Sequence, residues 1–188
     1  MKCFTLLMVL FATALARAEG RDDGRRDAPP AEKQALAALE KAGARFDKGP
    51  RGVVTGVILG SKTTDDTLVY LASLPHLETL RLQCALKVTD DGLSHLEGLT
   101  GLRRLWFGYT NITDVALVHL QNLANLQELH IGVYRSEFKD PGLVYLKGLK
   151  KLESLSLNYA KVSDKAVQDL QESLPHCKIE VRRTPPKQ

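Results

Sequence analysis

The stretch TDDGLSHLEGLTGLRRLWF, residues 89–107, decides the fold of this chain of 188 residues. Leucine recurs at every third position from Leu93 to Leu102, and the stretch ends in the apolar pair Leu105 and Phe107. The same string returns, with substitutions, around five aspartates spaced 24–26 residues apart: Asp65, Asp90, Asp114, Asp140 and Asp164. A fixed period in this range, with leucines at these spacings, predicts a solenoid of stacked repeats.

Each repeat closes on an apolar–x–apolar triplet, which predicts a short strand. Successive side chains of a strand point to opposite faces, so the apolar pair faces the core and the middle residue faces outward. Burial of one leucine contributes about 1.5–3 kcal/mol, so these pairs are expected to supply most of the stability. The six pairs are Val57/Leu59, Leu80/Leu82, Leu105/Phe107, Leu129/Ile131, Leu155/Leu157 and Ile179/Val181.

The helical part of each repeat is expected to begin at its aspartate. A Thr-Asp or Ser-Asp pair precedes four of these segments, and Lys139-Asp140 replaces it in the fifth. The hydroxyl or the carboxylate is expected to cap the first helical turn, and the negative charge suits the positive helix end. Leucines spaced by three drift off one face of a helix with 3.6 residues per turn, so helices of about two turns are expected, with the later leucines in a loop.

The alternation along the strands places three columns of side chains on the outward sheet face. The central column is Ile58, Arg81, Trp106, His130, Ser156 and Glu180, the column before it is Gly56, Thr79, Arg104, Glu128, Ser154 and Lys178, and the column after it is Gly60, Gln83, Gly108, Gly132, Asn158 and Arg182. Because tryptophan and arginine are the residues most enriched in interface hot spots, we predict a binding surface around the single tryptophan. Its members are Arg81, Arg104, Trp106, Glu128, His130 and Tyr109. The alternative is that Trp106 only covers a neighbouring side chain.

The N-terminal 18 residues are typical of a secretory signal peptide. A charged start at Lys2 precedes 14 uncharged residues, Cys3 to Ala16. Small residues at Ala16 and Ala18 suit cleavage before Glu19, and Ala14-Leu15-Ala16 offers a second cleavage site. The run is shorter than the about 20 apolar residues of a membrane-spanning helix. We therefore expect a secreted, periplasmic or cell-surface protein, without stable membrane insertion after cleavage.

The remaining sequence divides into four expected segments. Residues 19–30, EGRDDGRRDAPP, are charged and rich in proline and are expected to form a disordered linker. Residues 31–59 predict a helix over Ala31–Ala42 and then a hairpin, which together cap the solenoid because a terminal repeat exposes an unpaired core face. The repeats occupy residues 60–182, with a longer segment from Gly132 to Lys139 that is expected to bulge, and residues 183–188 are expected to form a disordered tail.

The string in residues 89–107 resembles the leucine-rich-repeat family, and within it the T-D-x-G-L type of exported bacterial proteins and F-box-associated proteins. The resemblance covers about Val53 to Val181, and Lys139 and Cys84-Ala85-Leu86 depart from the pattern. It implies an α/β solenoid with a parallel sheet on the concave face and short helices on the convex face. It also implies recognition of a protein or peptide through the concave face. The expected signal peptide argues against a cytosolic ubiquitin-ligase adaptor.

Composition and motifs favour a binding module over an enzyme. The net charge is +4, and no basic stripe with interleaved aromatic residues indicates a nucleic-acid partner. The histidines and serines form neither H-E-x-x-H nor G-x-S-x-G. Capping explains the five aspartates without a metal, and no cofactor is expected. An accessory component of the cell envelope is the alternative function, and an enzyme of unknown type ranks last.

The remaining chemistry concerns two cysteines and one asparagine. Cys84 and Cys177 lie four repeats apart, so at 4.7–4.9 Å per strand their separation is about 20 Å, beyond the about 7 Å limit of a disulfide. Both are expected to be small buried hydrophobic residues. Asn111-Ile112-Thr113 is a glycosylation sequon, which matters only in a secretory pathway that glycosylates.

Overall fold

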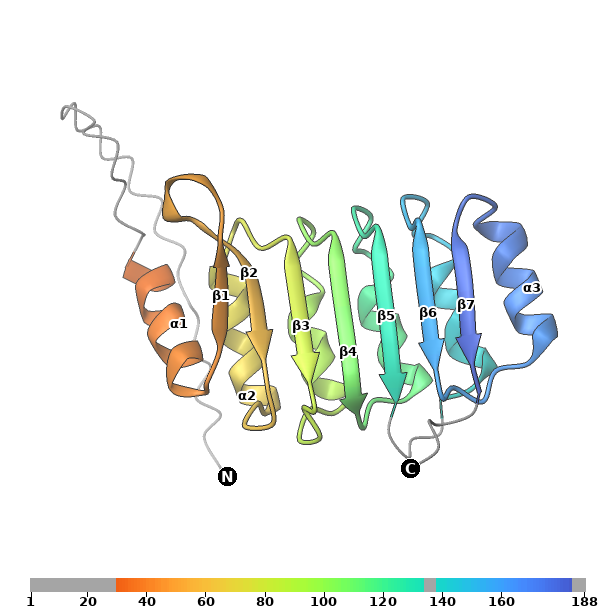
Figure 1. Ribbon diagram of the computed structural model, residues 1–188, viewed down its shortest axis with the longest axis horizontal. Coiled ribbons are helices and arrows are strands. Elements are labelled where there is room, and N and C mark those ends of the chain that lie inside the picture. The colour runs from red at the N-terminus through yellow and green to blue at the C-terminus, as the bar shows by residue number, and fades with distance from the viewer. Residues whose placement is uncertain (1–29, 134–137, 184–188) are drawn as a thin grey trace, which may run out of the picture.

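A computed structural model describes residues 30–133 and 138–183, and the described residues form one seven-stranded sheet in chain order (Figure 1). β1 (Arg45–Lys48) pairs antiparallel with β2 (Val54–Leu59). The next five strands continue the sheet from β2 in parallel: β3 (Thr79–Gln83), β4 (Arg104–Thr110), β5 (Glu128–Val133), β6 (Ser154–Asn158) and β7 (Lys178–Arg182). The predicted solenoid with its parallel sheet is confirmed.

Helical elements cover one face of the sheet and both of its ends. Figure 1 shows α1 (Pro30–Lys41) beside β1, α3 (Asp164–Ser173) beside β7, and the helical segments of the other repeats behind the strands. These segments are α2 (Asp65–Leu68), η2 (Val69–Ser73), η3 (Asp91–Leu96), η4 (Asp114–Leu120) and η5 (Asp140–Leu146), and a further short turn, η1 (Pro50–Gly52), joins β1 to β2. The expected signal peptide, linker, bulge and tail lie wholly or largely outside the described residues.

The central repeats contain 3-10 helices, so the expected α-helical turns were wrong. A 3-10 helix has three residues per turn, so leucines at every third position all lie on one face of the helix. The turns continue past η3, because the N–H of Leu99 donates to the carbonyl of Leu96 and the N–H of Leu102 donates to that of Leu99, both at 2.9 Å. Leu96 and Leu102 are fully buried, and Leu99 is 7% exposed. The later leucines therefore belong to one chain of turns and not to a loose loop.

The core lies between the sheet and the helical segments. Phe107 and Phe138 are its largest fully buried side chains. At one end, Leu39 of α1 enters the same core and is fully buried. At the other end, Ile179 and Val181 of β7 are only partly buried. The first strand of the solenoid is therefore better covered than the last described one.

The first four aspartates of the period each bond to the next repeat, so of the two expected capping groups, hydroxyl and carboxylate, the carboxylate does not cap its own helix. Oδ1 of Asp90 accepts from the backbone N–H of Thr113 at 2.7 Å, and Oδ2 accepts from the Thr113 hydroxyl at 2.6 Å. Capping is left to the hydroxyl, since Oγ1 of Thr113 accepts from the N–H of Val115 at 3.2 Å. The same pair of bonds joins Asp65 to Thr89 and Asp140 to Ser163. We call this series of aspartates the Asp ladder.

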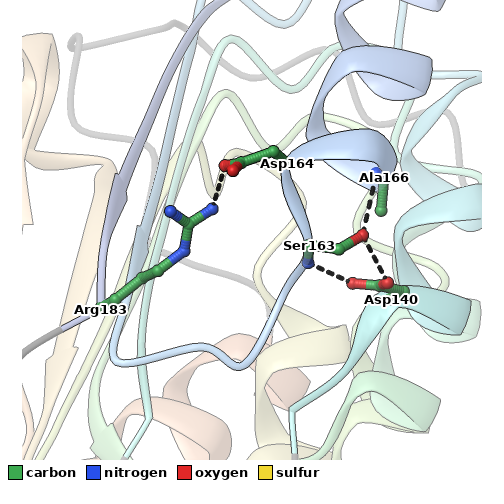
Figure 2. Close-up of polar contacts among 5 residues, drawn as sticks. All are labelled: Asp140, Ser163, Asp164, Ala166 and Arg183. Carbon is green, nitrogen blue, oxygen red and sulfur yellow. Dashed lines mark hydrogen bonds and ion pairs between the residues drawn. The ribbon is translucent and has the colours of Figure 1, made fainter.

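Figure 2 shows the last step of the Asp ladder. Both carboxylate oxygens of Asp140 bond Ser163, through its N–H and its hydroxyl, each at 2.7 Å. The same hydroxyl accepts from the N–H of Ala166 at 3.2 Å and so caps α3. Asp164, the final aspartate, instead forms an ion pair with Arg183. Asp164 is thus bonded by a side chain that directly follows β7, whereas Asp140 is bonded by the next helical segment.

The glycine of T-D-x-G-L makes room for the Asp ladder. A Cβ atom on Gly92 would collide with the carboxylate of Asp65, and one on Gly142 would collide with the backbone carbonyl of Asp114. The Asp114 step lacks the hydroxyl bond of the other steps, because Lys139 offers its backbone N–H at 3.1 Å but has no hydroxyl to donate. The period of the sequence therefore encodes contacts between repeats as well as the core.

Candidate binding face

The outward sheet face carries the three predicted columns in register. Arg81 of β3 pairs with Trp106 of β4, which pairs with His130 of β5. In the column before, Arg104 lies between Thr79 and Glu128. Trp106 is partly exposed and not tucked into the core. The structure therefore brings five of the six predicted residues together on three adjacent strands.

Arg81 and Trp106 form the central contact of this face. The guanidinium carbon of Arg81 lies 4.5 Å from the centre of the Trp106 ring. A cation over an aromatic face contributes about 0.5–1 kcal/mol at an exposed site. The contact limits the rotamers of two large side chains before any partner arrives, so less conformational entropy is lost on binding.

Arg104 is held beside this pair by the neighbouring strand. Its Nε donates to Oγ1 of Thr79 at 3.1 Å, and Thr79 is buried. The Arg104 residue itself is exposed. The outward face therefore carries one guanidinium group over the Trp106 ring, that of Arg81, and a second bonded to Thr79, that of Arg104.

His130 is bonded to Asn158, a residue of the outward face that is not among the six predicted binding residues. Nδ2 of Asn158 lies 2.9 Å from Nε2 of His130. Burial, and then the charge of Arg182, lower the pKa of His130, which favours a neutral ring that accepts this bond. Among the described residues, Oδ1 of Asn158 is one of three buried side-chain oxygen atoms without a hydrogen-bond partner. The sequence signal that could have indicated this contact is the position of Asn158, a polar residue in an outward column beside Gly132.

The carboxyl edge of the strands carries the sixth predicted residue, Tyr109. It is 47% exposed and has a left-handed backbone with φ of 55°, as do Cys84 (φ 55°) and Tyr159 (φ 67°) at the same point of other repeats. Tyr159 packs partly against the core. The exposure of Cys84 corrects the expectation of a buried thiol, whereas Cys177 is buried and its thiol pKa is raised by that burial.

A groove of about 620 Å³ lies at the opposite edge, where the strands begin. We call it the amino-edge groove. The hairpin tip between β1 and β2 lines it on one side, and the loops that lead into β3, β4 and β5 line it on the other. The repeat period did not predict this groove, because it does not determine where the hairpin tip lies relative to the loops. Its side chains include Pro50, Arg51, Pro75, Glu78 and Arg103.

The described part of the chain contains neither a metal-binding cluster nor a helix suited to a membrane. Within residues 30–133 and 138–183, no three His, Cys, Asp or Glu side chains come together in a way that suits a metal ion. Among the described helices, none combines the length and apolarity that a membrane crossing requires.

Comparison with known proteins identifies the fold. No family model and no curated protein matches the chain. Among solved structures, it is similar to the leucine-rich-repeat ectodomain of the receptor kinase SOBIR1 from Arabidopsis thaliana, with 14% identity, a TM-score of 0.50, and coverage of 83% of this chain and 93% of that one. The fold is a leucine-rich-repeat α/β solenoid with its parallel sheet on the concave face.

Two Listeria monocytogenes internalins are also similar to the chain. Internalin inlF has 21% identity and a TM-score of 0.40, with coverage of 81% of this chain and 55% of that one. Internalin C2 has 19% identity and a TM-score of 0.41, with coverage of 84% and 87%. The chain thus spans about half the length of the inlF chain.

Proposed function

We propose that the chain is a non-catalytic recognition module that binds a protein or peptide through the concave face. The observation that carries the proposal is the Arg81–Trp106 contact on the sheet face that the helical segments leave uncovered. An aromatic ring and two guanidinium groups on one rigid surface match the composition of interface hot spots. Six strands in register hold these side chains on a rigid surface, so little conformational entropy is lost when a partner binds.

The proposed contact residues have complementary roles. Trp106 offers apolar area, Arg81 and Arg104 offer donors to a partner carboxylate or carbonyl, and Glu128 offers an acceptor. His130 and Tyr109 extend the surface toward the carboxyl edge of the strands. A partner that lies across β3, β4 and β5 would contact all six.

Export and the segment boundaries belong to the same proposal. The charged start and the apolar run of residues 1–18 support a signal peptide, and a secreted, periplasmic or surface location follows from it. The segments 19–30, 31–59, 60–182 and 183–188 are proposed as linker, cap, repeats and tail. The T-D-x-G-L subtype is proposed on the string in residues 89–107 and on the role of Gly92 and Gly142 in the Asp ladder.

The test is site-specific photo-crosslinking in the intact exported fraction. A benzoylphenylalanine at Tyr109, on the concave side, is compared with one at Val144, which is 55% exposed on η5 of the convex side. We expect a defined crosslinked species from the first position and none from the second. The opposite pattern would overturn the concave-face assignment.

The role of Trp106 is then measured with the captured partner. Trp106→Ala is expected to weaken binding at least tenfold, because a hot-spot residue contributes about 2 kcal/mol or more. An affinity that changes by less than about 0.5 kcal/mol, small against hot-spot values, would remove Trp106 from the site.

A further inference from the structure

Residues at the tip of the β1–β2 hairpin form one wall of the amino-edge groove. Arg51 at this tip has a left-handed backbone with φ of 62°, and Gly52 follows with φ of 76°. The N–H of Gly49 donates to the carbonyl of Val53 at 2.8 Å, and the N–H of Gly52 donates to that of Gly49 at 3.2 Å. A left-handed backbone is unfavourable for an L-residue with a side chain and is readily adopted by glycine. The tip thus holds an arginine where a glycine would be more stable.

The facing wall carries a second arginine in a loose ion pair. Nε of Arg103 is 3.9 Å from Oε2 of Glu78, and the two side chains are 54% and 47% exposed. Exposed pairs of this kind contribute little to stability. An incoming carboxylate therefore competes for Arg103 against a weak internal partner.

The charges and the length of the groove define what fits it. Arg51 and Arg103 outnumber Glu78, and Pro50 and Pro75 add apolar surface. The lining runs from β2 to the loop before β5, three strand spacings or about 14 Å. Extended chain covers that length in about four residues, at about 3.3 Å per residue.

We propose that the amino-edge groove binds an acidic peptide segment of about four extended residues, with one carboxylate held between Arg51 and Arg103. Charge-assisted contacts from guanidinium groups to a carboxylate are among the stronger and more directional ones in proteins. The apolar walls contact the side chains that flank this carboxylate. The site lies at the strand edge and is independent of the proposed surface around Trp106.

The test is an NMR titration of the ¹⁵N-labelled chain with the peptide acetyl-Glu-Leu-Glu-Leu-amide. We expect chemical-shift changes centred on the amides of Arg51, Glu78 and Arg103. Arg51→Gln and Arg103→Gln should each weaken binding about tenfold, the loss expected for one charge-assisted contact. Glu78→Gln should instead tighten binding, because it removes the internal competitor. A merely structural role for these residues would not produce opposite signs.

Matched controls separate the groove from general electrostatic attraction. Arg45 is an exposed arginine at the other end of the same hairpin, so Arg45→Gln should leave the affinity unchanged. The peptide acetyl-Gln-Leu-Gln-Leu-amide should give no shifts. Shifts centred on Trp106, equal affinity for the glutamine peptide, or no loss in Arg51→Gln and Arg103→Gln would each overturn the proposal.

Discussion

Leu105 and Arg104 are neighbours on β4, yet they face opposite sides of the sheet and follow different rules. In register with Leu105 are Leu80 and Leu129, so three neighbouring repeats carry the same residue here. In register with Arg104 are Thr79 and Glu128, a different residue in each repeat. Stacking keeps the inward residues apolar, because each side chain packs into the shared core. It leaves the outward identities open, so the outward face is where the repeats differ in chemistry.

The largest expected effect tests this comparison at the two neighbouring positions. Leu105 is fully buried, so Leu105→Asp would place an unpaired carboxylate in the core and is expected to abolish folding. Arg104→Asp changes an exposed residue and is expected to alter the free energy of unfolding by less than about 1 kcal/mol. Urea unfolding followed by circular dichroism measures both. A cooperative transition in Leu105→Asp would show that the inward register is wrong.

The second-largest expected effect is the loss of stability when Gly142, which lies against the neighbouring repeat, gains a side chain. Gly142→Ala would press a Cβ against the backbone carbonyl of Asp114 and is expected to destabilise the chain by about 3 kcal/mol or more. The matched control is Gly148→Ala, because no atom lies within 4 Å of a Cβ added there. Equal thermal stability of the two variants would contradict the close approach of neighbouring repeats.

A smaller loss of stability is expected when an aspartate of the Asp ladder is removed, and its size should depend on whether the next repeat offers a hydroxyl. Asp90→Ala removes two bonds to Thr113 and leaves a backbone N–H without its partner, at an expected loss of about 1–3 kcal/mol. Asp114→Ala removes the bond to the Lys139 N–H but no bond from a hydroxyl, and should cost less. Denaturant midpoints of the two variants give the comparison. An equal or larger loss of stability in Asp114→Ala would contradict a stabilising contribution from the Thr113 hydroxyl.

The sequence predicted the features that recur in every repeat and missed the features that arise between repeats. The spacing of Leu105 and Phe107 was enough for the strand register, since alternation alone fixes which side chains face outward. The partner of Asp90 was missed because Thr113 lies 23 residues later and becomes its neighbour only when the repeats stack.

Two further features were not predicted: the type of helix in the central repeats and the bond between Asn158 and His130. Leucines at a spacing of three were interpreted with the 3.6-residue period of an α-helix, although a 3-10 helix has three residues per turn. The bond between Asn158 and His130 joins outward columns on two strands, where no periodic pattern constrains the side chains.

The smallest expected effect is the pH dependence that His130 adds to the outward face. Burial and Arg182 lower the pKa of His130 in the folded chain, so near the unfolded histidine pKa of about 6.5 the unfolded chain binds more protons. The contribution of the neutral ring is therefore fully present above that pH. It is lost progressively as the pH falls below it, and the loss ends at the folded pKa.

Replacing His130 separates its contribution to the pH dependence of stability from the contributions of all other titrating groups. The wild-type chain and His130→Gln are compared by urea unfolding between pH 5 and pH 8, and the difference between their unfolding free energies is followed. We expect wild type to lose stability relative to His130→Gln as the pH decreases. A difference that stays constant across this window would contradict the lowered pKa. A difference that changes in the other direction would mean that the charged ring is stabilised in the folded chain, and that its bond with Asn158 is not made by the neutral form.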